Sequence, residues 1–208
     1  MEFIKLNPFI RYASAHAKVR QSKKLSVCYD CRLFYVTSGK GGIVANGKNY
    51  LLSENDVVFL PPETKYGFTT TGEFTLYVIN LDLVDEFTNF KKSFGTPDED
   101  GFDSKLTLKY PLPKDFSEVI VVKNAYSVKR HLERCVELFL QKTPYYVEES
   151  TARVKLALLE TLRESQNSEY PIVQKVIDYI RENYWQLDLT NQTIAKNFNY
   201  HENNISSY

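Results

Sequence analysis

Hydrophobic side chains in the first half of the chain come in short runs rich in β-branched and aromatic residues, a pattern typical of strands. The runs cover residues 27–39, 42–52, 55–62 and 73–83. Turn residues separate them, and Asn46-Gly47 favours the positive φ angles of a two-residue hairpin turn. Closely spaced strands with such turns predict a small β-barrel or sandwich. The segments "LTLKYPLP" (106–113) and "EVIVV" (118–122) are expected to add strands, and residues 1 to about 24 form a mixed arm ahead of them.

Beyond about residue 124 the apolar residues recur at steps of three and four, which predicts helices. One helix is expected over Asn124–Gln141 and a second over Glu148–Glu164. Their apolar faces consist of Val128, Leu132, Cys135, Val136 and Phe139, and of Val154, Ala157, Leu158 and Leu162. We expect these helices to form a homodimer contact, because the faces exceed what one flank of a barrel needs. Packing of both faces on the barrel is the alternative.

A polar linker, "SQNSEYP", ends at Pro171, where we place a domain boundary, and a helical pattern follows over residues 172–185. The last stretch then predicts a helix over Asn191–Phe198, capped by Thr190, and a second helix from about Glu202. Small Ala195 lets two helices approach, and Asn199 tolerates the left-handed turn between them. The apolar positions are Ile194, Phe198, Tyr200, Ile205 and Tyr208. This pattern favours a helix-turn-helix, and an ordinary helical hairpin is the alternative.

Composition restricts the function classes. The chain has 208 residues, of which 43% are hydrophobic, enough for one large domain or two modest ones with a real core. Its 26 Lys and Arg balance 26 Asp and Glu, whereas a complete DNA-binding domain is usually basic. No apolar run is long enough to cross a membrane, so we expect no membrane association. Three cysteines, an odd number, favour a reducing cytoplasm over a disulfide scaffold.

The histidines and cysteines predict a protein that is not an enzyme and holds no metal or other cofactor. Metal-dependent barrel enzymes need several histidines that converge inside the barrel, and none occurs in the predicted strands. The three histidines are His16, His131 and His201. Cys28 and Cys31 form a C-x-x-C pair, but residues three apart in a strand face opposite sides of the sheet. We therefore interpret them as structural, and Cys135 as a core residue.

Two stretches together resemble the AraC/XylS family of bacterial transcription regulators. "CYDCRLFYVTSGKGGIVANGKNYLLSENDVVFLPPETKYGF" is similar to the family's N-terminal cupin-type barrel, and "YIRENYWQLDLTNQTIAKNFNYHENNISSY" to the start of its DNA-binding domain. The implied fold is α+β, with a jelly-roll barrel over residues 1–122, dimerisation or linker helices over 123–168 and a helix-turn-helix domain beginning at 169. In "PPETKYGF", Lys65-Tyr66 stands where metal-binding versions of the turn carry His, which implies no metal site of that kind.

The resemblance implies the effector-sensing and dimerisation part of a regulator that binds operator DNA as a homodimer. The family's DNA-binding domain is similar to two helix-turn-helix units, and only the first is present here. We therefore expect the chain to be a truncated piece of a longer regulator that does not bind operator DNA specifically by itself. The alternative is a cupin-type small-molecule-binding protein without DNA function.

Candidate site residues follow from the predicted faces and from the resemblance, which places the effector inside the barrel against the N-terminal arm. For the effector they are Arg20, Arg32, Tyr35, Lys65, Tyr66, Phe68, Leu76 and Val78. Aromatic walls with a few polar groups suit a sugar, and we expect a carbohydrate effector, although a small aromatic or an acid fits the walls equally well. Any single aromatic residue is alternatively part of the barrel core. For DNA the candidates are His201, Glu202, Asn203, Ser206 and Ser207, with a solvated polar face as the alternative.

Overall fold

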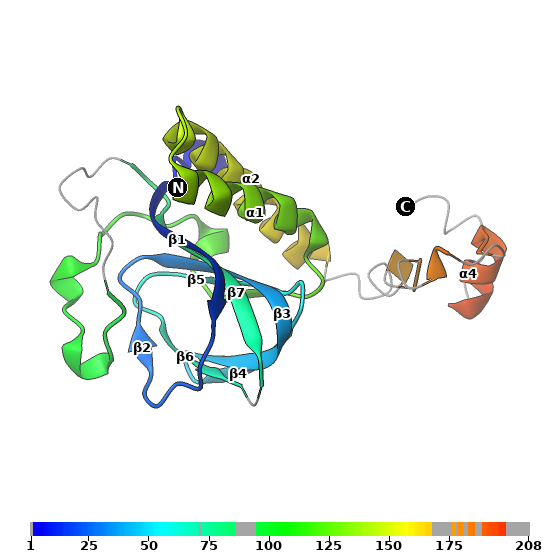
Figure 1. Cartoon of the computed structure of the whole chain (residues 1–208), viewed down its shortest axis with the longest axis horizontal. Helices are drawn as coiled ribbons and strands as arrows, with labels where there is room; N and C mark the ends of the chain where they lie inside the picture. The colour runs from blue at the N-terminus through cyan, green and yellow to red at the C-terminus, as the bar shows by residue number, and fades with distance from the viewer. Residues whose placement is uncertain are drawn as a thin grey trace. The chain divides into compact units, whose positions relative to one another are not determined.

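The computed structural model divides the chain into two compact units, Met1–Arg163 and Glu164–Tyr208 (Figure 1). The residues it describes are 2–70, 72–85, 95–167, 176–177, 179–180, 183–185 and 189–198. In the first unit, two helices lie side by side over one face of a strongly curved antiparallel sheet (Figure 1). This arrangement is a cupin-like barrel with a helical layer, as the strand pattern predicted.

Eight strands build the barrel. Their bounds are β1 Phe9–Lys18, β2 Ser26–Val27, β3 Cys31–Ala45, β4 Lys48–Ser53, β5 Val57–Leu60, β6 Lys65–Thr69, β7 Phe74–Asp82 and β8 Ile120–Val122. The main path through the sheet is β1-β7-β3-β5-β8, while β4 and β6 both pair with β3, and β2 pairs with β6. Every pairing is antiparallel.

Strand β3 closes the barrel because its two halves pair with different neighbours. Residues 31–39 pair with β7 and residues 40–45 pair with β4. The strand bends at Gly39, which has a φ of +82°. A Cβ at this position would lie 1.9 Å from the carbonyl oxygen of Glu73, so only glycine fits the bend.

The local sequence predictions have mixed outcomes. Asn46 and Gly47 both have positive φ, 47° and 79°, and form the predicted hairpin turn between β3 and β4. Strand β8 confirms the strand predicted in "EVIVV". The strand predicted in "LTLKYPLP" is wrong, since residues 107–113 have no regular structure, and Pro111 and Pro113 cannot donate to a ladder. The predicted arm is also partly wrong, because it contains the ten-residue strand β1.

The two helices of the first unit are α1, Tyr126–Gln141, and α2, Tyr146–Asn167, within three residues of the predicted bounds. Helix α1 ends at Lys142, which adopts the left-handed conformation and donates its N–H to Leu138 O. Both helices pack their apolar faces on the outer face of the sheet. No helix in the described part of the chain is long and apolar enough to cross a membrane.

Two apolar clusters lie on opposite faces of the sheet. The helix-side core joins one set of alternating strand residues to α1 and α2, and it includes Leu33, Tyr35, Ile79, Leu132 and Leu158. The barrel-interior core joins the other set, and it includes Phe34, Val36, Ile43, Phe74 and Leu76. Strand residues therefore alternate strictly between the helices and the barrel interior.

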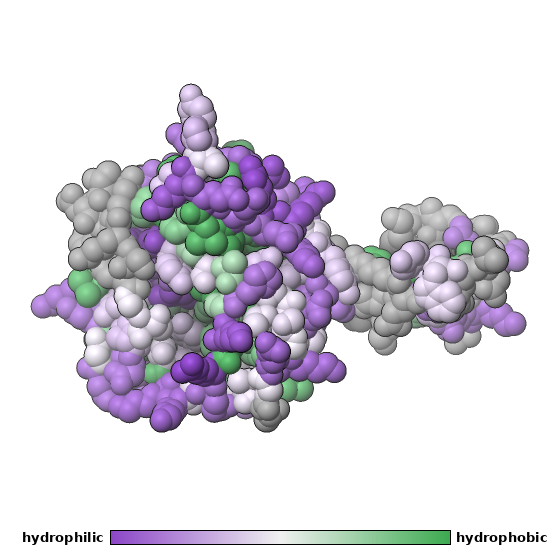
Figure 2. All heavy atoms as spheres, in the orientation of Figure 1, coloured by the Kyte–Doolittle hydropathy of each residue, from purple (hydrophilic) through white to green (hydrophobic). Residues whose placement is uncertain are grey.

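The helix-side core corrects the reason given for a dimer. Leu158 is 0% exposed within this chain, and the other predicted contact residues are buried too, except Phe139, which is half-buried against the same core. The alternative, in which both faces pack on the barrel, describes them. Figure 2 shows that hydrophilic side chains dominate the visible face, apart from a hydrophobic patch between the helices and the strands. The exposed apolar side chains that remain on the helices are Leu140, Val147 and Leu156.

The second unit contains α4, Asn191–Asn197, which confirms the helix predicted over Asn191–Phe198. Thr190 caps it as predicted, because its hydroxyl accepts the N–H of Thr193, whose side chain in turn accepts the N–H of Thr190. Ile194 and Ala195 are buried, and the Phe198 ring meets Tyr179 edge-on at 5.5 Å. The predicted boundary at Pro171 and the second helix from Glu202 lie outside the described residues.

Candidate functional site

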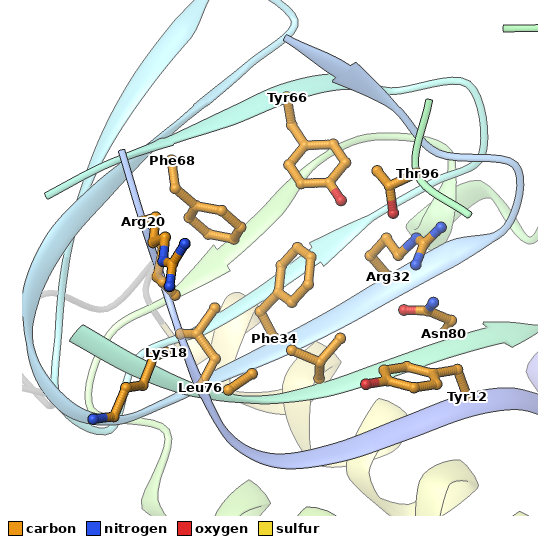
Figure 3. A pocket seen from close by; sticks show the side chains of 13 residues that line it. Tyr12, Lys18, Arg20, Arg32, Phe34, Tyr66, Phe68, Leu76, Asn80 and Thr96 are labelled. Carbon is orange, nitrogen blue, oxygen red and sulfur yellow. The ribbon is translucent and has the colours of Figure 1, made fainter. Parts of the chain in front are cut away.

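A cavity of about 450 Å³ opens inside the barrel (Figure 3). It lies between the inner faces of β1, β3, β6 and β7 and the chain that follows β1. Its lining consists of Tyr12, Ala17, Lys18, Val19, Arg20, Arg32, Phe34, Tyr66, Phe68, Leu76, Val78, Asn80 and Thr96. The volume falls within the range of small-molecule sites, about 300–1,000 Å³.

The strand register arranges the floor of this cavity in rows. Arg32 of β3 pairs with Asn80 of β7, and Asn80 pairs with Tyr12 of β1. The next inward-facing pair is Phe34 with Val78. One end of the cavity is therefore polar and its middle is apolar. Figure 3 shows this order, with the Phe34 ring at the centre and Arg32, Asn80 and Tyr12 at one end.

The polar end contains two buried groups that lack hydrogen-bond partners. Arg32 is 2% exposed and Asn80 is 4% exposed. Neither Arg32 Nη2 nor Asn80 Oδ1 has a hydrogen-bond partner within the described part of the protein. Each buried polar atom without a partner costs on the order of 1–3 kcal/mol. A donor and an acceptor are thus left open side by side at the buried end of the cavity.

Behind the polar end lies a cluster of four buried charges. Arg11 donates from Nε to Asp82 Oδ2 at 2.7 Å, and the same nitrogen lies 4.0 Å from Asp30 Oδ2. Arg32 Nε lies 2.9 Å from Asp30 Oδ1, an ion-pair distance without the geometry of a hydrogen bond. Two arginines and two aspartates balance, so the cluster carries no surplus negative charge to repel an anion from Arg32.

Burial sets the protonation of the two aspartates in this cluster. Desolvation raises the pKa of Asp30 to about 6, and the attraction of Arg32 and Arg11 offsets only part of the rise. Desolvation also raises the pKa of Asp82, against the pull of Arg11. Asp30 therefore exchanges its proton near pH 6, next to the buried Arg32 side chain.

An aromatic wall forms the apolar middle of the cavity. The Phe34 ring lies 5.3 Å from Phe68 in an edge-on contact and 5.8 Å from Tyr66. Tyr66 is buried, which raises the pKa of its phenol, and its side chain hydrogen-bonds Thr96. The rings supply apolar surface, while the Tyr66 hydroxyl belongs to the polar end (Figure 3).

The residues that follow β1 form the other end of the cavity. Val19 donates its N–H to Phe74 O at 2.8 Å, and Ser22 donates its N–H to Phe68 O at 2.9 Å. The segment between them thus bridges β7 and β6 and carries Arg20 beside the cavity. Lys18 and Arg20 are exposed at this end.

Six of the eight predicted effector residues line the cavity: Arg20, Arg32, Tyr66, Phe68, Leu76 and Val78. Tyr35 does not, because it faces the helix-side core and donates its hydroxyl to Asn55 Oδ1 at 2.8 Å. Lys65 does not either, since it is exposed and pairs with Glu99. Both corrections have the same reason, since side chains alternate between the two faces of a strand. Tyr35 lies three residues from Arg32, and Lys65 lies one residue from Tyr66, so each points away from the cavity that its neighbour faces.

Sequence reasoning missed several lining residues, above all Tyr12, Phe34 and Asn80. Phe34 alternates with Arg32 along β3, and Asn80 alternates with Val78 along β7, so strict period-two counting would have found both. Tyr12 was missed because its strand was taken for an arm.

The cysteines and histidines stand partly as predicted. Cys28 faces the barrel interior and Cys31 the helix side, and both are buried and free. Burial raises the pKa of Cys28 to about 11, and its thiol lies 3.3 Å from Pro61 O. Cys135 is buried as expected. His16 lies in β1, so the expectation that no histidine stands in a strand is wrong.

Among the described residues, no group of three or more His, Cys, Asp or Glu side chains is placed to hold a metal. His16 is exposed and lies beside the Tyr77 ring, on the helix side of the sheet. The absence of a metal and of enzyme activity stays a prediction. The DNA-binding candidates His201, Glu202, Asn203, Ser206 and Ser207 lie outside the described residues.

A second cavity, of about 410 Å³, lies outside the barrel interior. It is lined by Pro62, Glu63, Thr107, Leu108, Lys109, Tyr110 and Leu112. It shares no lining residue with the first cavity and includes both an acid and a base, so its charge pattern favours neither sign of ligand.

Residues 30–123 match the family model of the AraC-like ligand binding domain. The matched segment runs from Asp30 to the end of β8 and contains Arg32, the aromatic wall and Asn80. It excludes β1 and the residues that follow it, as well as both long helices. No curated protein matches the chain.

Parts of two solved structures are similar to part of this chain. Salicylate 1,2-dioxygenase from Pseudoaminobacter salicylatoxidans, in an adduct with gentisate, shares 19% identity at a TM-score of 0.28, over 30% of this chain and 17% of the dioxygenase. A cupin protein from Bacteroides fragilis shares 13% identity at a TM-score of 0.30, over 36% of this chain and 65% of that protein. This chain thus spans well under two thirds of the dioxygenase, and no activity is taken from either likeness.

Proposed function

We propose that this chain is the effector-sensing part of a bacterial DNA-binding transcription regulator. One observation carries the proposal: the segment similar to an AraC-like ligand binding domain supplies Arg32, Asn80 and the aromatic wall of a ligand-sized cavity that has open polar groups at one end. A small molecule that fills this cavity would satisfy Arg32 and Asn80, so its binding would stabilise the barrel.

The path from the cavity to the helices supports a sensing role. Strand β1 contributes Tyr12 to the cavity. The residues just ahead of β1 are held by α2, since Thr151 Oγ1 donates to Pro8 O at 3.2 Å and Lys155 Nζ donates to Leu6 O at 2.7 Å. A ligand that shifts β1 therefore acts on contacts that α2 makes.

The DNA-binding and dimer functions are the finer part of the proposal. Helix α4, with its capping box and buried Ala195, fits the first helix of a helix-turn-helix. In the complete regulator, His201, Glu202, Asn203, Ser206 and Ser207 would then face operator DNA. A homodimer would use the apolar side chains that α1 and α2 leave exposed, Leu140, Val147 and Leu156. We place the regulator in the cytoplasm, which contains the operator DNA and keeps free thiols reduced.

The test is DNA capture by the complete product of the reading frame that encodes this chain. The product is cross-linked in its own cells, and the bound chromosomal fragments are sequenced. Enrichment of a short shared sequence is expected. Ala195→Glu serves as the matched variant, because a long charged side chain at a buried position of α4 should abolish enrichment while the barrel still melts normally.

The other outcome is equally informative. A complete product that enriches no DNA sequence, yet binds small molecules in the barrel, would instead be a cupin-type binding protein without DNA function.

A further inference from the structure

The charges that line the barrel cavity have one sign. Among the described residues, its lining includes Lys18, Arg20 and Arg32 but no aspartate or glutamate. Lys18 and Arg20 are exposed at one end, while Arg32 is buried at the other. A cavity lined only by cations attracts an anion and excludes a ligand with positive charge.

The Arg32 guanidinium has hydrogen-bond donors that its neighbours leave unpaired. Within the described part of the chain, the ion-pair contact of Arg32 is Asp30, which also lies near Arg11. Nη2 of Arg32 has no hydrogen-bond partner among these residues. A guanidinium offers several donors in a planar fork, and a carboxylate is the group whose two oxygens match that fork. A ligand carboxylate would thus relieve the cost of leaving buried donors unpaired.

Asn80 specifies the neighbouring group of the ligand. It stands directly across from Arg32 in the β3–β7 register, and its Oδ1 is an acceptor without a partner. The ligand must supply a hydrogen-bond donor there. An ammonium donor is unfavourable because no carboxylate lines the cavity, whereas a hydroxyl donates without charge.

The residue pairs beyond Arg32 and Asn80 on the cavity floor determine the polarity of the rest of the ligand. Phe34 and Val78 follow the polar pair, and Leu76 and Phe68 lie beyond them. These side chains offer apolar surface and ring faces. A ligand that is polar over its whole surface, such as a sugar, would leave its hydroxyls unpaired against them.

We infer that the effector is a small hydroxy acid with an apolar or aromatic body, whose carboxylate pairs with Arg32 and whose hydroxyl donates to Asn80 Oδ1. This inference rests on the proposed sensing function and narrows the open choice among a sugar, an aromatic and an acid.

Four probes test the inference by calorimetry. Phenyllactate carries the carboxylate, the hydroxyl and the ring. Phenylpropionate lacks only the hydroxyl, phenyllactamide lacks only the charge, and glucose lacks both the charge and the apolar body. Phenyllactate is expected to bind about 10- to 100-fold more tightly than phenyllactamide, as for a charged hydrogen-bonded pair. It should bind about tenfold more tightly than phenylpropionate, as for one neutral hydrogen bond to a buried acceptor.

Two variants and a control locate the binding. Asn80→Asp keeps the size of the side chain and presents a carboxylate to Arg32 from within, so it should abolish binding of phenyllactate while the protein stays folded. Arg32→Lys keeps the charge next to Asp30 but loses the planar fork, so it should weaken binding about tenfold. Lys48→Gln removes a positive charge from an exposed position of β4, outside the cavity, and should leave binding unchanged.

The outcomes separate this inference from the proposed function. Equal or tighter binding of phenyllactamide or glucose, binding of phenyllactate that Asn80→Asp leaves intact, or no binding of any acid each overturns the hydroxy-acid assignment. The sensing and DNA-binding proposal is decided separately, by the DNA that the complete product enriches.

Discussion

Replacing Asp30 by asparagine should change how the stability of the barrel depends on pH. Asp30 is almost completely buried between Arg32 and Arg11. Two opposing effects act on it: burial disfavours the charged carboxylate, and the two guanidiniums favour it. Burial prevails and raises the pKa of Asp30 from 3.8 to about 6.

The sign and size follow from this shift. In the unfolded chain Asp30 loses its proton near pH 3.8, and in the folded chain near pH 6. The protonated form therefore favours folding, fully so below pH 3.8, and this contribution is lost as the pH rises through 6. A shift of about two pKa units corresponds to roughly 3 kcal/mol of unfolding free energy.

Urea unfolding at pH 4, 5, 6 and 7 measures this difference. Asparagine cannot titrate, so the unfolding free energy of the wild type minus that of Asp30→Asn should fall by roughly 2 kcal/mol from pH 4 to pH 7, because part of the total is already lost at pH 4. Glu118→Gln, at an exposed carboxylate, controls for the loss of one negative charge. A difference that stays constant, or that grows with pH, would show that the two arginines outweigh burial and that Asp30 is ionised throughout.

Three further predictions concern the packing and the chemistry. Leu158→Ala should lower the free energy of unfolding by about 2–5 kcal/mol in urea titrations, because Leu158 is buried in the helix-side core. Leu140→Ala, at a position 56% exposed, should change the free energy of unfolding by less than about 0.5 kcal/mol. Similar losses in the two variants would refute the burial of Leu158. Gly39→Ala should lower the free energy of unfolding by more than about 2 kcal/mol, because the added Cβ would clash with Glu73 O. Gly47 also has a positive φ but has open space around it, so Gly47→Ala should lower the free energy of unfolding by only about 1 kcal/mol. Equal melting temperatures of the two variants would contradict this difference. Elemental analysis of untagged protein should find well under one transition metal per chain, and stoichiometric iron, manganese or zinc would contradict it.

Most of the cavity-lining residues that were predicted correctly could be predicted because side chains alternate between the two faces of a strand. Leu76 and Val78 were placed on one face of their strand, and both line the cavity. Arg32 and Tyr35 stand three residues apart in one strand, so period two already puts them on opposite faces, and only Arg32 faces the cavity. The same holds for adjacent Lys65 and Tyr66.

Contacts between distant residues could not be read from the sequence. Arg11 and Asp82 are 71 residues apart, and nothing local in either strand marks them as a buried pair. The role of β1 was missed for a similar reason, since its sequence "FIRYASAHAK" alternates poorly and the strand is bulged where it pairs with β7. The bounds of both helices were predicted to within three residues. The periodicity of a helix shows that it has an apolar face but does not show what covers that face, which here is the sheet.

The most direct test of the central claim is a crystal structure of the protein with phenyllactate. One ligand is expected inside the barrel, with its carboxylate on Arg32, its hydroxyl on Asn80 and its ring against Phe34. A ligand bound instead in the second cavity, beside Thr107 and Tyr110, or one bound in the barrel with its ring on Arg32, would contradict it.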